Sequence, residues 1–199
     1  MKKKQLINSV GREFGSGGHV IAEMLANKFG LPLYDSNILQ EIAMHKNLDH
    51  REIERYDEAP RNKLFTRTVK GHSSSPEEHI AQMQFRYLRE KAENGESFVV
   101  VGRCSETILK GYPGVVSIFV LADKECKINR IKNLNKISSI EADVMINKQD
   151  RQRKFYHNYH CAIKWGDSRN YDITINSSRM GLERTADALE AYIRARMED

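Results

Sequence analysis

The stretch KQLINSVGREFGSGGHVIAEMLANKFGLPLYDS, residues 4–36, decides the fold of this chain. An apolar-rich run over residues 4–10 predicts a strand, which is followed at once by a loop rich in glycine: Gly11, Gly15, Gly17 and Gly18. After the loop, apolar residues recur at helical spacing up to a glycine that ends the pattern: Ile21, Met24, Leu25 and Phe29, then Gly30. The predicted order is therefore strand, glycine loop, helix.

The remaining sequence continues this alternation of strands and helices. Apolar runs at residues 31–34, 97–101, 115–121 and 172–176 predict four more strands. Periodic apolar residues predict helices around 80–95, 122–134, 138–160 and 182–193, the third beginning at a Ser138–Glu141 capping box. This order predicts an α/β fold with a mostly parallel sheet and helices on both faces. Residues 37–75 are polar and mixed, and we interpret them as an insertion.

Length and composition bound the class of protein. At 199 residues and 23.0 kDa, with 40% hydrophobic residues, the chain has the size of one α/β domain. No apolar run approaches the roughly 20 residues that span a bilayer, and residues 1–4 lead into a strand rather than a signal-peptide core. Three widely spaced cysteines, Cys104, Cys126 and Cys161, fit neither a disulfide framework nor a zinc site. We therefore expect a cytoplasmic protein with no membrane association.

The net charge of +5 is concentrated in one region of the sequence. Between residues 124 and 169, eleven lysines and arginines stand beside five acidic residues. Such a segment is either a solvated charged face or a site for an anion. General nucleic-acid binding is less favoured, because no recognised nucleic-acid motif accompanies the basic segment. Steep salt dependence of binding to DNA or RNA would revive that interpretation.

Candidate binding residues follow the predicted strands, because ligands of parallel sheets bind at the carboxyl ends of the strands. Three groups stand there: the loop from Gly11 to His19, Asp35 with Ser36, and Gly102 with Arg103. A glycine loop before a helix offers backbone N–H groups and a helix N-terminus to a phosphate. The residues that fit this description are Gly15, Ser16, Gly17 and Gly18, with His19 as a further hydrogen-bond donor.

The loop departs from a regular Walker A sequence, G-x-x-x-x-G-K-[ST]. With Gly17 as its last glycine, Arg12 stands at the first glycine and Gly18 at the lysine. His19 and Val20 take the place of the hydroxyl that binds magnesium. Arg12 can supply positive charge from the other end of the loop, since arginine is always protonated. The histidines show no ligand spacing, so the sequence predicts no metal site beyond magnesium brought by a nucleotide.

These residues resemble a known family. REFGSGGHVIAEMLANKFGLPLYDS, residues 12–36, is similar without a gap to the P-loop, first helix and second strand of bacterial cytidylate kinases. VVVGRCSETI, residues 99–108, resembles their strand and D-G-R-D segment, with Val101 and Cys104 in place of the two aspartates. KQDRQR, residues 148–153, resembles their lid segment. With YDITINSS at 171–178, the pattern is most similar to the cytidylate-kinase-like proteins.

The resemblance implies one P-loop kinase-like domain over residues 1–199, of the three-layer P-loop NTPase type with a central parallel five-stranded sheet. A helical acceptor-site insertion is implied for residues 37–95, and a lid-like helical segment for residues 136–165. The implied reaction transfers the γ-phosphoryl group of ATP, with magnesium, to a nucleoside monophosphate such as CMP or dCMP. Its partner is then a nucleotide or a small phosphorylated molecule.

The resemblance also implies roles for particular residues. Arg130 and Arg153 would face the transferring phosphoryl group and join Arg12 as catalytic candidates. Asp150 would orient a lid arginine or contact the cytosine or sugar. The candidates for the acceptor site are Asp35, Ser36, Gly102 and Arg103. On spacing alone, Asp150 and Arg153 are explained by a surface pair on a helix.

Two functions stay open at this point. The first is a kinase with a rearranged loop, acting on CMP or on another small phosphate acceptor. The second is a nucleotide- or phosphate-binding protein that has lost phosphoryl transfer and acts as a sensor or partner-binding module. The second is considered because the missing lysine and hydroxyl are groups on which ATP–Mg²⁺ handling depends. The sequence does not predict an oligomeric state.

Overall fold

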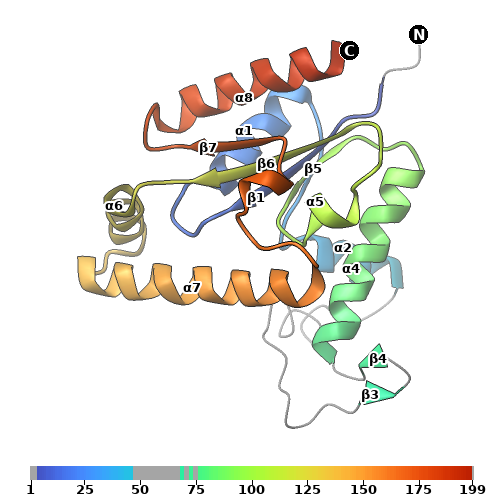
Figure 1. Cartoon of the computed structure of the whole chain (residues 1–199), viewed down its shortest axis with the longest axis horizontal. Coiled ribbons are helices and arrows are strands. Elements are labelled where there is room, and N and C mark those ends of the chain that lie inside the picture. The colour runs from blue at the N-terminus through green and yellow to red at the C-terminus, as the bar shows by residue number, and fades with distance from the viewer. Residues whose placement is uncertain (1–3, 47–67, 70–71, 74–75, 199) are drawn as a thin grey trace.

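The computed structural model describes residues 4–46, 68–69, 72–73 and 76–198 of the chain. Its centre is a five-stranded parallel sheet in the order β2-β5-β1-β6-β7 (Figure 1). The strands are β1 (Ile7–Arg12), β2 (Leu33–Tyr34), β5 (Phe98–Val101), β6 (Val115–Leu121) and β7 (Ile173–Asn176). The predicted α/β fold with a parallel five-stranded sheet is confirmed.

Helices cover both faces of this sheet (Figure 1). One face packs against α1 (Gly18–Phe29) and α8 (Gly181–Glu198), and the other against α2 (Ile38–Lys46), α4 (Pro76–Glu93) and α5 (Ser105–Ile108). Successive side chains of a strand point to opposite faces, so Val99 and Val101 join the first core while Phe98 and Val100 join the second. A strand buried on both faces reads as a continuous apolar run, which is why β5 is evident in the sequence.

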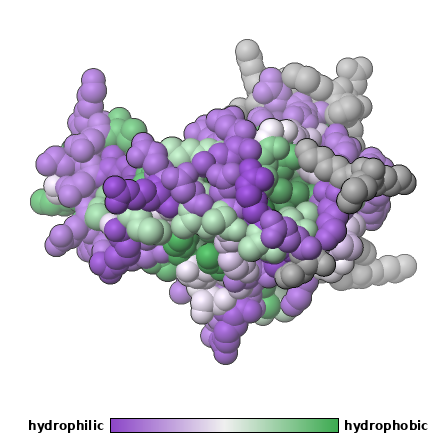
Figure 2. Space-filling view, turned by 90° about the horizontal axis from the view of Figure 1, so that it is seen from above, coloured by the Kyte–Doolittle hydropathy of each residue, from purple (hydrophilic) through white to green (hydrophobic). Residues whose placement is uncertain are grey.

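Helix α8 is amphipathic and forms part of the outer surface. Its buried residues, Thr185, Ala186, Leu189 and Ile193, recur at helical spacing on the side that faces the sheet. The opposite side faces the viewer in Figure 2, where most of the surface is hydrophilic and apolar residues show in smaller areas between polar ones. No helix among the described residues is both long and apolar enough to cross a membrane.

The first strand lies further along the chain than predicted. A strand over residues 4–10 was expected, but β1 is Ile7–Arg12. Pairing begins at Ile7, which has neighbours on both sides, and continues until Gly11 and Arg12 pair with Phe119 and Val120 of β6. The prediction ends at Val10 because Gly11 opens the predicted glycine loop and glycine has low strand propensity. The register with β6 overrides that propensity and brings Arg12 to the edge of the sheet.

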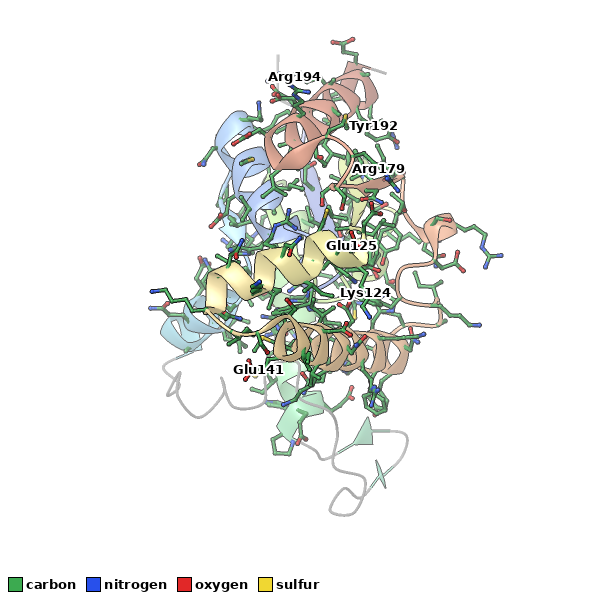
Figure 3. The ribbon with its side chains drawn as sticks, turned by 90° about the vertical axis from the view of Figure 1, so that its left-hand side faces the viewer. Lys124, Glu125, Glu141, Arg179, Tyr192 and Arg194 are labelled. Carbon is green, nitrogen blue, oxygen red and sulfur yellow. The ribbon has the colours of Figure 1, made fainter. Side chains whose placement is uncertain are left out.

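Two helices that cross each other form an arm beside the sheet: α6 (Lys124–Asn135), seen end-on in Figure 1, and α7 (Ser139–His160), which lies below the sheet in that view. Figure 3 shows α6 in front, lying between the sheet and α7. The predicted capping box is present, because Glu141 N donates to Ser138 Oγ at 3.2 Å and Ser138 N donates to Glu141 Oε2 at 2.8 Å. A short 3-10 helix, Ser168–Asn170, precedes β7.

The predicted insertion at residues 37–95 is only partly described, since residues 47–67, 70–71 and 74–75 lie outside the described residues. Its start is not a polar insertion. Helix α2 buries Ile38, Leu39 and Ile42 in the same core as Phe98. The short strands β3 (Thr68–Val69) and β4 (His72–Ser73) pair antiparallel before α4 begins at Pro76. Whether this region is an acceptor-site insertion stays a prediction.

Candidate active site

Parallel strand order brings the predicted binding segments to one edge of the sheet. The glycine loop follows β1, Asp35 follows β2, and Gly102 follows β5. The loop is tied to this edge by two hydrogen bonds: Glu13 N donates to Val120 O at 3.0 Å, and Ser177 Oγ donates to Ser16 O at 2.6 Å. Its position therefore depends on the ends of three strands.

The shape of the loop requires glycine at two positions. Gly15 and Gly17 both have φ of +79°, in the left-handed region that side chains other than glycine rarely adopt. Between them, Ser16 is buried, and its Oγ donates to Glu13 O at 2.8 Å and accepts from Gly18 N at 3.3 Å. The serine therefore holds the turn from within.

Glycine is also required where the loop enters α1. A Cβ atom at Gly17 would clash with Leu182 Cδ2, and one at Gly18 would lie 2.5 Å from Arg12 Cβ. Gly17 is the N-cap of α1 and has no side chain with which to cap the helix. The first N–H groups of a helix have no intrahelical acceptor, and the helix dipole favours an anion there. Binding of an anion such as a phosphate group is therefore what the sequence and the helix end together predict for this part of the loop.

Two cationic side chains from α6 lie against the loop. Arg130 Nη1 donates to Gly15 O, and its Cζ is 3.3 Å from the position of a Cβ atom at Gly17. Burial lowers the pKa of Arg130. Lys127 comes one helical turn earlier on the same face of α6, and its Cβ is 3.2 Å from the position of a Cβ atom at Gly15. The sequence analysis missed Lys127, although its i, i+3 spacing from Arg130 was the available signal.

Helix α7 closes over the other side of the loop. Phe14 N donates to Asp150 Oδ1 at 2.6 Å, and Asp150 Oδ2 is 3.3 Å from Lys127 Nζ. Arg153 Nη1 donates to Arg12 O at 3.4 Å, and its guanidinium carbon lies 5.4 Å from the centroid of the Phe14 ring. The Asp-x-x-Arg pair of the resemblance therefore contacts the glycine loop itself, rather than forming only a surface pair on its own helix.

Lys127 links the loop to both helices of the arm. Its Nζ is 3.0 Å from Glu13 Oε2 as well as 3.3 Å from Asp150 Oδ2. Burial favours the neutral amine, but the hydrogen bond to Glu13 and the charges of both carboxylates outweigh burial and raise the pKa of Lys127. The ammonium group therefore stays charged beside the loop.

His19 and the candidate acceptor residues at the end of β2 lie together. His19 Nδ1 is 3.6 Å from Asp35 Oδ2, and His19 Nε2 is 3.3 Å from Glu23 Oε1. Asp35 Oδ1 also accepts from Asn37 N at 3.0 Å, while Ser36 is exposed. Both ring nitrogens of His19 thus lie beside carboxylates. The proposed hydrogen bond from His19 to a phosphate group stays a prediction.

The segment after β5 has an unusual backbone. Gly102, Arg103 and Cys104 have φ of +74°, +57° and +55°, three consecutive left-handed residues of which two carry side chains. For residues other than glycine, such a conformation costs about 1–3 kcal/mol and persists where the surrounding structure imposes it. Arg103 is only 4% exposed, so its charged side chain is held within the fold beside this turn. Strain of this kind is typical of functional sites.

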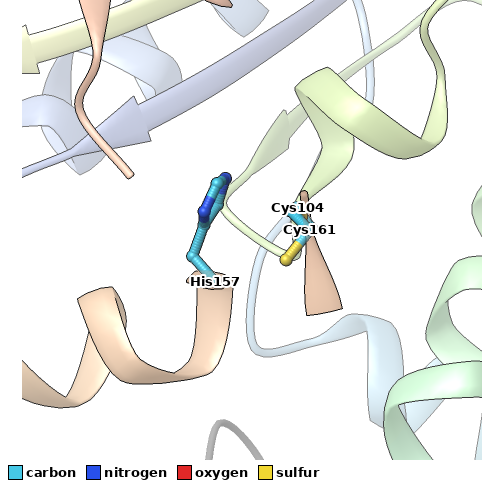
Figure 4. Close-up of side chains that lie close together, drawn as sticks. All are labelled: Cys104, His157 and Cys161. Atoms are coloured by element: carbon cyan, nitrogen blue, oxygen red, sulfur yellow. The ribbon is translucent and has the colours of Figure 1, made fainter. Parts of the chain in front are cut away.

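The structure also brings together residues that the sequence analysis kept apart. Cys104, His157 and Cys161 are all buried, and their ligand atoms lie within 4.8 Å of one another (Figure 4). The expectation of no zinc site rested on sequence spacing, and 53 residues separate Cys104 from His157. Only the packing of α7 against the end of β5 places these donors side by side.

The residues around the loop fit a phosphate group better than a bare magnesium ion. The loop leads into the N-terminus of α1, where no side chain caps the helix, and the guanidinium of Arg130 lies beside it. Ser16 Oγ is already hydrogen-bonded within the loop, and the nearby carboxylates of Glu13 and Asp150 both pair with Lys127. We therefore expect a magnesium ion to be held mainly by nucleotide phosphate oxygens, which are its usual ligands.

Comparisons with known proteins bear on the identity of the chain. The model of the cytidylate kinase-like family matches residues 8–179. The chain is similar to an uncharacterized protein from Eubacterium ventriosum whose crystal structure is known. The two sequences are 37% identical, and the structures superpose with a TM-score of 0.76 over 96% of this chain and 99% of that chain. No curated protein matches.

Two shikimate kinases share the fold at low identity. The enzyme from Bacteroides thetaiotaomicron is 13% identical with a TM-score of 0.55, covering 95% of this chain and 98% of that one. The enzyme from Acinetobacter baumannii, solved with shikimate, is 14% identical with a TM-score of 0.52, covering 98% of this chain and 95% of that one. The two shikimate kinases show the fold alone. The family match, in contrast, covers most of the sequence, and this chain therefore belongs to the cytidylate kinase-like family.

Proposed function

We propose that this protein transfers the γ-phosphoryl group of ATP to a nucleoside monophosphate, with CMP or dCMP as the acceptor. Membership of the cytidylate kinase-like family supports a nucleotide kinase-type function. The observation that carries the proposal is the contact of the glycine loop with cationic side chains from two helices far from it in sequence: Lys127, Arg130 and Arg153. Phosphoryl transfer depends on positioning and charge neutralisation, which this arrangement supplies.

Each part of the site has a task in this reaction. The loop N–H groups and the start of α1 bind the phosphate chain of ATP. Arg130, which is hydrogen-bonded to Gly15 O, neutralises the negative charge of the phosphate groups from the side of α6. Arg153, which is hydrogen-bonded to Arg12 O, does so from the side of α7. Both guanidinium groups are held in place before the substrate arrives, so they need little rearrangement as charge develops on the transferred group.

Lys127 takes over part of the task of the missing Walker lysine. Gly18 stands where that lysine is expected, but the ammonium of Lys127 reaches the same loop from α6. Two carboxylates keep it protonated, and a phosphate oxygen can replace Asp150 as its partner without leaving the ammonium exposed. The charge is thus supplied by a different element of the fold.

The acceptor binds across the ends of β2 and β5. These strands are neighbours in the sheet, with Leu33 beside Val99 and Tyr34 beside Val100. Asp35 and Ser36 therefore stand next to the turn formed by Gly102 and Arg103. In the proposed site, Arg103 contacts the acceptor phosphate, while Asp35 contacts the sugar or base.

One observation favours the alternative, a nucleotide- or phosphate-binding sensor without phosphoryl transfer. Lys127 is neutralised by two carboxylates, and Ser16 Oγ is committed to the backbone of its own loop. A loop so stabilised can bind a phosphate without acting on it. This function predicts nucleotide-dependent stabilisation with no product.

The test is an assay of ATP–Mg²⁺ with a panel of nucleoside monophosphates, with products separated chromatographically and Tm followed for each ligand. Arg153→Ala is compared with Arg151→Ala, which removes an exposed arginine from the same helix. We expect CDP or dCDP from the wild-type protein and from Arg151→Ala, and a loss of about 100-fold or more in kcat/KM for Arg153→Ala.

Other outcomes separate the functions. Stabilisation by nucleotide without any diphosphate product would establish the sensor. Equal losses of thermal stability and activity in Arg153→Ala would remove the catalytic role of Arg153, because a structural contact alone would then account for both. Faster turnover with a different phosphate acceptor would keep the kinase and reject CMP as its substrate.

A further inference from the structure

Two cysteines and a histidine from separate parts of the chain meet beside the proposed acceptor site (Figure 4). Cys104 is the N-cap of α5, directly after Gly102 and Arg103. His157 lies in the last turn of α7, and Cys161 is the C-cap of that helix. Their relative exposures are 3%, 4% and 7%, so all three side chains are withdrawn from solvent.

The donor set has the chemistry of a thiophilic metal site. Thiolate and imidazole are the ligands that zinc and related ions prefer, and soft thiolates disfavour magnesium and calcium. A tetrahedral ion with metal–sulfur distances of about 2.3 Å holds two sulfurs about 3.8 Å apart. Here Cys104 Sγ, Cys161 Sγ and a ring nitrogen of His157 already lie within 4.8 Å of one another. Closing around an ion therefore requires movements of about 1 Å or less.

A carboxylate orients the histidine from behind. Glu106 Oε1 lies 2.6 Å from His157 Nε2, and the two side chains are only 3% and 6% exposed. A carboxylate on one imidazole nitrogen is the usual outer partner of a metal-binding histidine, because it fixes the tautomer and leaves the other nitrogen for the ion. In this cluster the other nitrogen is Nδ1, which lies 3.4 Å from Asn158 Oδ1, a long contact that the ion would replace.

Charge balance also favours a divalent cation. The side chains of Cys104 and Cys161 are buried in the same apolar cluster, so thiolates formed there need a counter-charge close by. Two thiolates neutralise a divalent cation, so the one net charge left in the assembly is that of Glu106, whose carboxylate is hydrogen-bonded by His157 Nε2.

We propose that Cys104, His157 and Cys161 bind a thiophilic divalent cation of the zinc class, with Glu106 as the positioning residue of His157. Three protein donors leave a fourth position for a water or another small donor. The site is independent of the proposed kinase reaction. It joins the end of α7, which carries Arg153, to the turn that carries Arg103, and so fixes the lid helix relative to the acceptor side.

The test uses the intact, reduced protein freed of metal and titrated with Cd²⁺ and Co²⁺. Thiolate-to-metal charge-transfer absorption reports sulfur ligands directly. Cys104→Ser and Cys161→Ser are compared with Cys126→Ser, which removes the one cysteine outside the cluster. We expect one equivalent of metal with thiolate absorption in the wild type and Cys126→Ser, and at least a 10-fold weaker affinity in the other two variants.

A second measurement keeps the proposal falsifiable when a cluster variant fails to fold. Saturation of the wild-type protein with Zn²⁺ at about 100 times its dissociation constant should raise Tm by about 5–10 °C. Absence of stoichiometric thiolate absorption in the reduced wild type would overturn the proposal. An unchanged metal affinity in Cys161→Ser would also overturn it. A reduced protein that binds no metal, but whose mass falls by two hydrogens on mild oxidation, would show that the two cysteines form a disulfide pair instead.

Discussion

Replacing Asp150 by alanine tests whether α7 holds the glycine loop in place. The carboxylate makes two contacts with groups that matter to the proposed site: it accepts from Phe14 N at 2.6 Å, and it lies 3.3 Å from Lys127 Nζ. Its side chain is 19% exposed and that of Lys127 is 11% exposed, so solvent screens this pair only partly. Alanine removes both contacts and leaves the Phe14 N–H without its acceptor.

The magnitude follows from these two contacts. A buried donor left without its partner costs about 1–3 kcal/mol, at the upper end when the lost acceptor was charged. We expect about 2–3 kcal/mol for Asp150→Ala, with the lost ion pair included. At about 2–4 °C per kcal/mol for a chain of this size, Tm falls by about 4–12 °C. Asp150→Asn keeps an acceptor for Phe14 N and should lose about half as much.

Asp143 provides the matched control. It is an aspartate on the same helix, and its carboxylate is 2.9 Å from Lys124 Nζ, a shorter distance than in the Asp150 pair. The Lys124 side chain is 66% exposed, however, and exposed pairs contribute about 0–1 kcal/mol. Asp143→Ala should therefore change Tm by only a few degrees.

Thermal and urea unfolding of the three variants measure these differences, and amide exchange at Phe14 reports the loop locally. Faster exchange at Phe14 in Asp150→Ala, with unchanged exchange in the β6 core, is the expected pattern. Equal effects of Asp143→Ala and Asp150→Ala, or unchanged Phe14 exchange, would refute the assignment of Asp150 as the anchor of the loop.

Two further predictions concern the loop itself. Gly17→Ala should cost about 1–2 kcal/mol from its left-handed backbone, plus the displacement of Leu182, and should abolish nucleotide-dependent stabilisation. Gly30→Ala is the control, because Gly30 also has a left-handed backbone but a Cβ atom there would meet nothing within 4 Å. Similar losses of nucleotide binding in both variants would contradict a specific role of Gly17 in binding the phosphate groups. Ser177→Ala removes the donor to Ser16 O and should lower stability by about 1–2 kcal/mol in urea unfolding; no change would show that the bond does not hold the loop.

The fold could be predicted because its strands carry their own signal. β5 and β6 are continuous apolar runs buried on both faces, and the glycine loop marks a break between β1 and α1. The limits of β1 could not be predicted, since Gly11 and Arg12 are in the strand only because β6 offers Phe119 and Val120 as partners. The burial of α2 was not predicted, because Ile38, Leu39 and Ile42 stand among polar residues.

The site was predictable where residues are adjacent in sequence and not where the fold brings them together. Gly15 to Gly18 follow from the loop pattern. The contact of Asp150 with Phe14, and that of Lys127 with Glu13, cross 136 and 114 residues and depend on how α6 and α7 pack over the sheet edge. The resemblance indicated Asp150 and Arg153, but the loop contacts of Asp150 are visible only in three dimensions.

The most direct test of the proposed kinase function follows a labelled phosphoryl group. The wild-type protein is incubated with magnesium, CMP and ATP that carries the label only on its γ-phosphate, and the products are separated. Transfer of the label to the β-phosphate of CDP, dependent on both CMP and protein, is the result that the proposed kinase predicts. Label that stays on ATP or appears only as inorganic phosphate, while ATP raises the Tm of the protein, would contradict it.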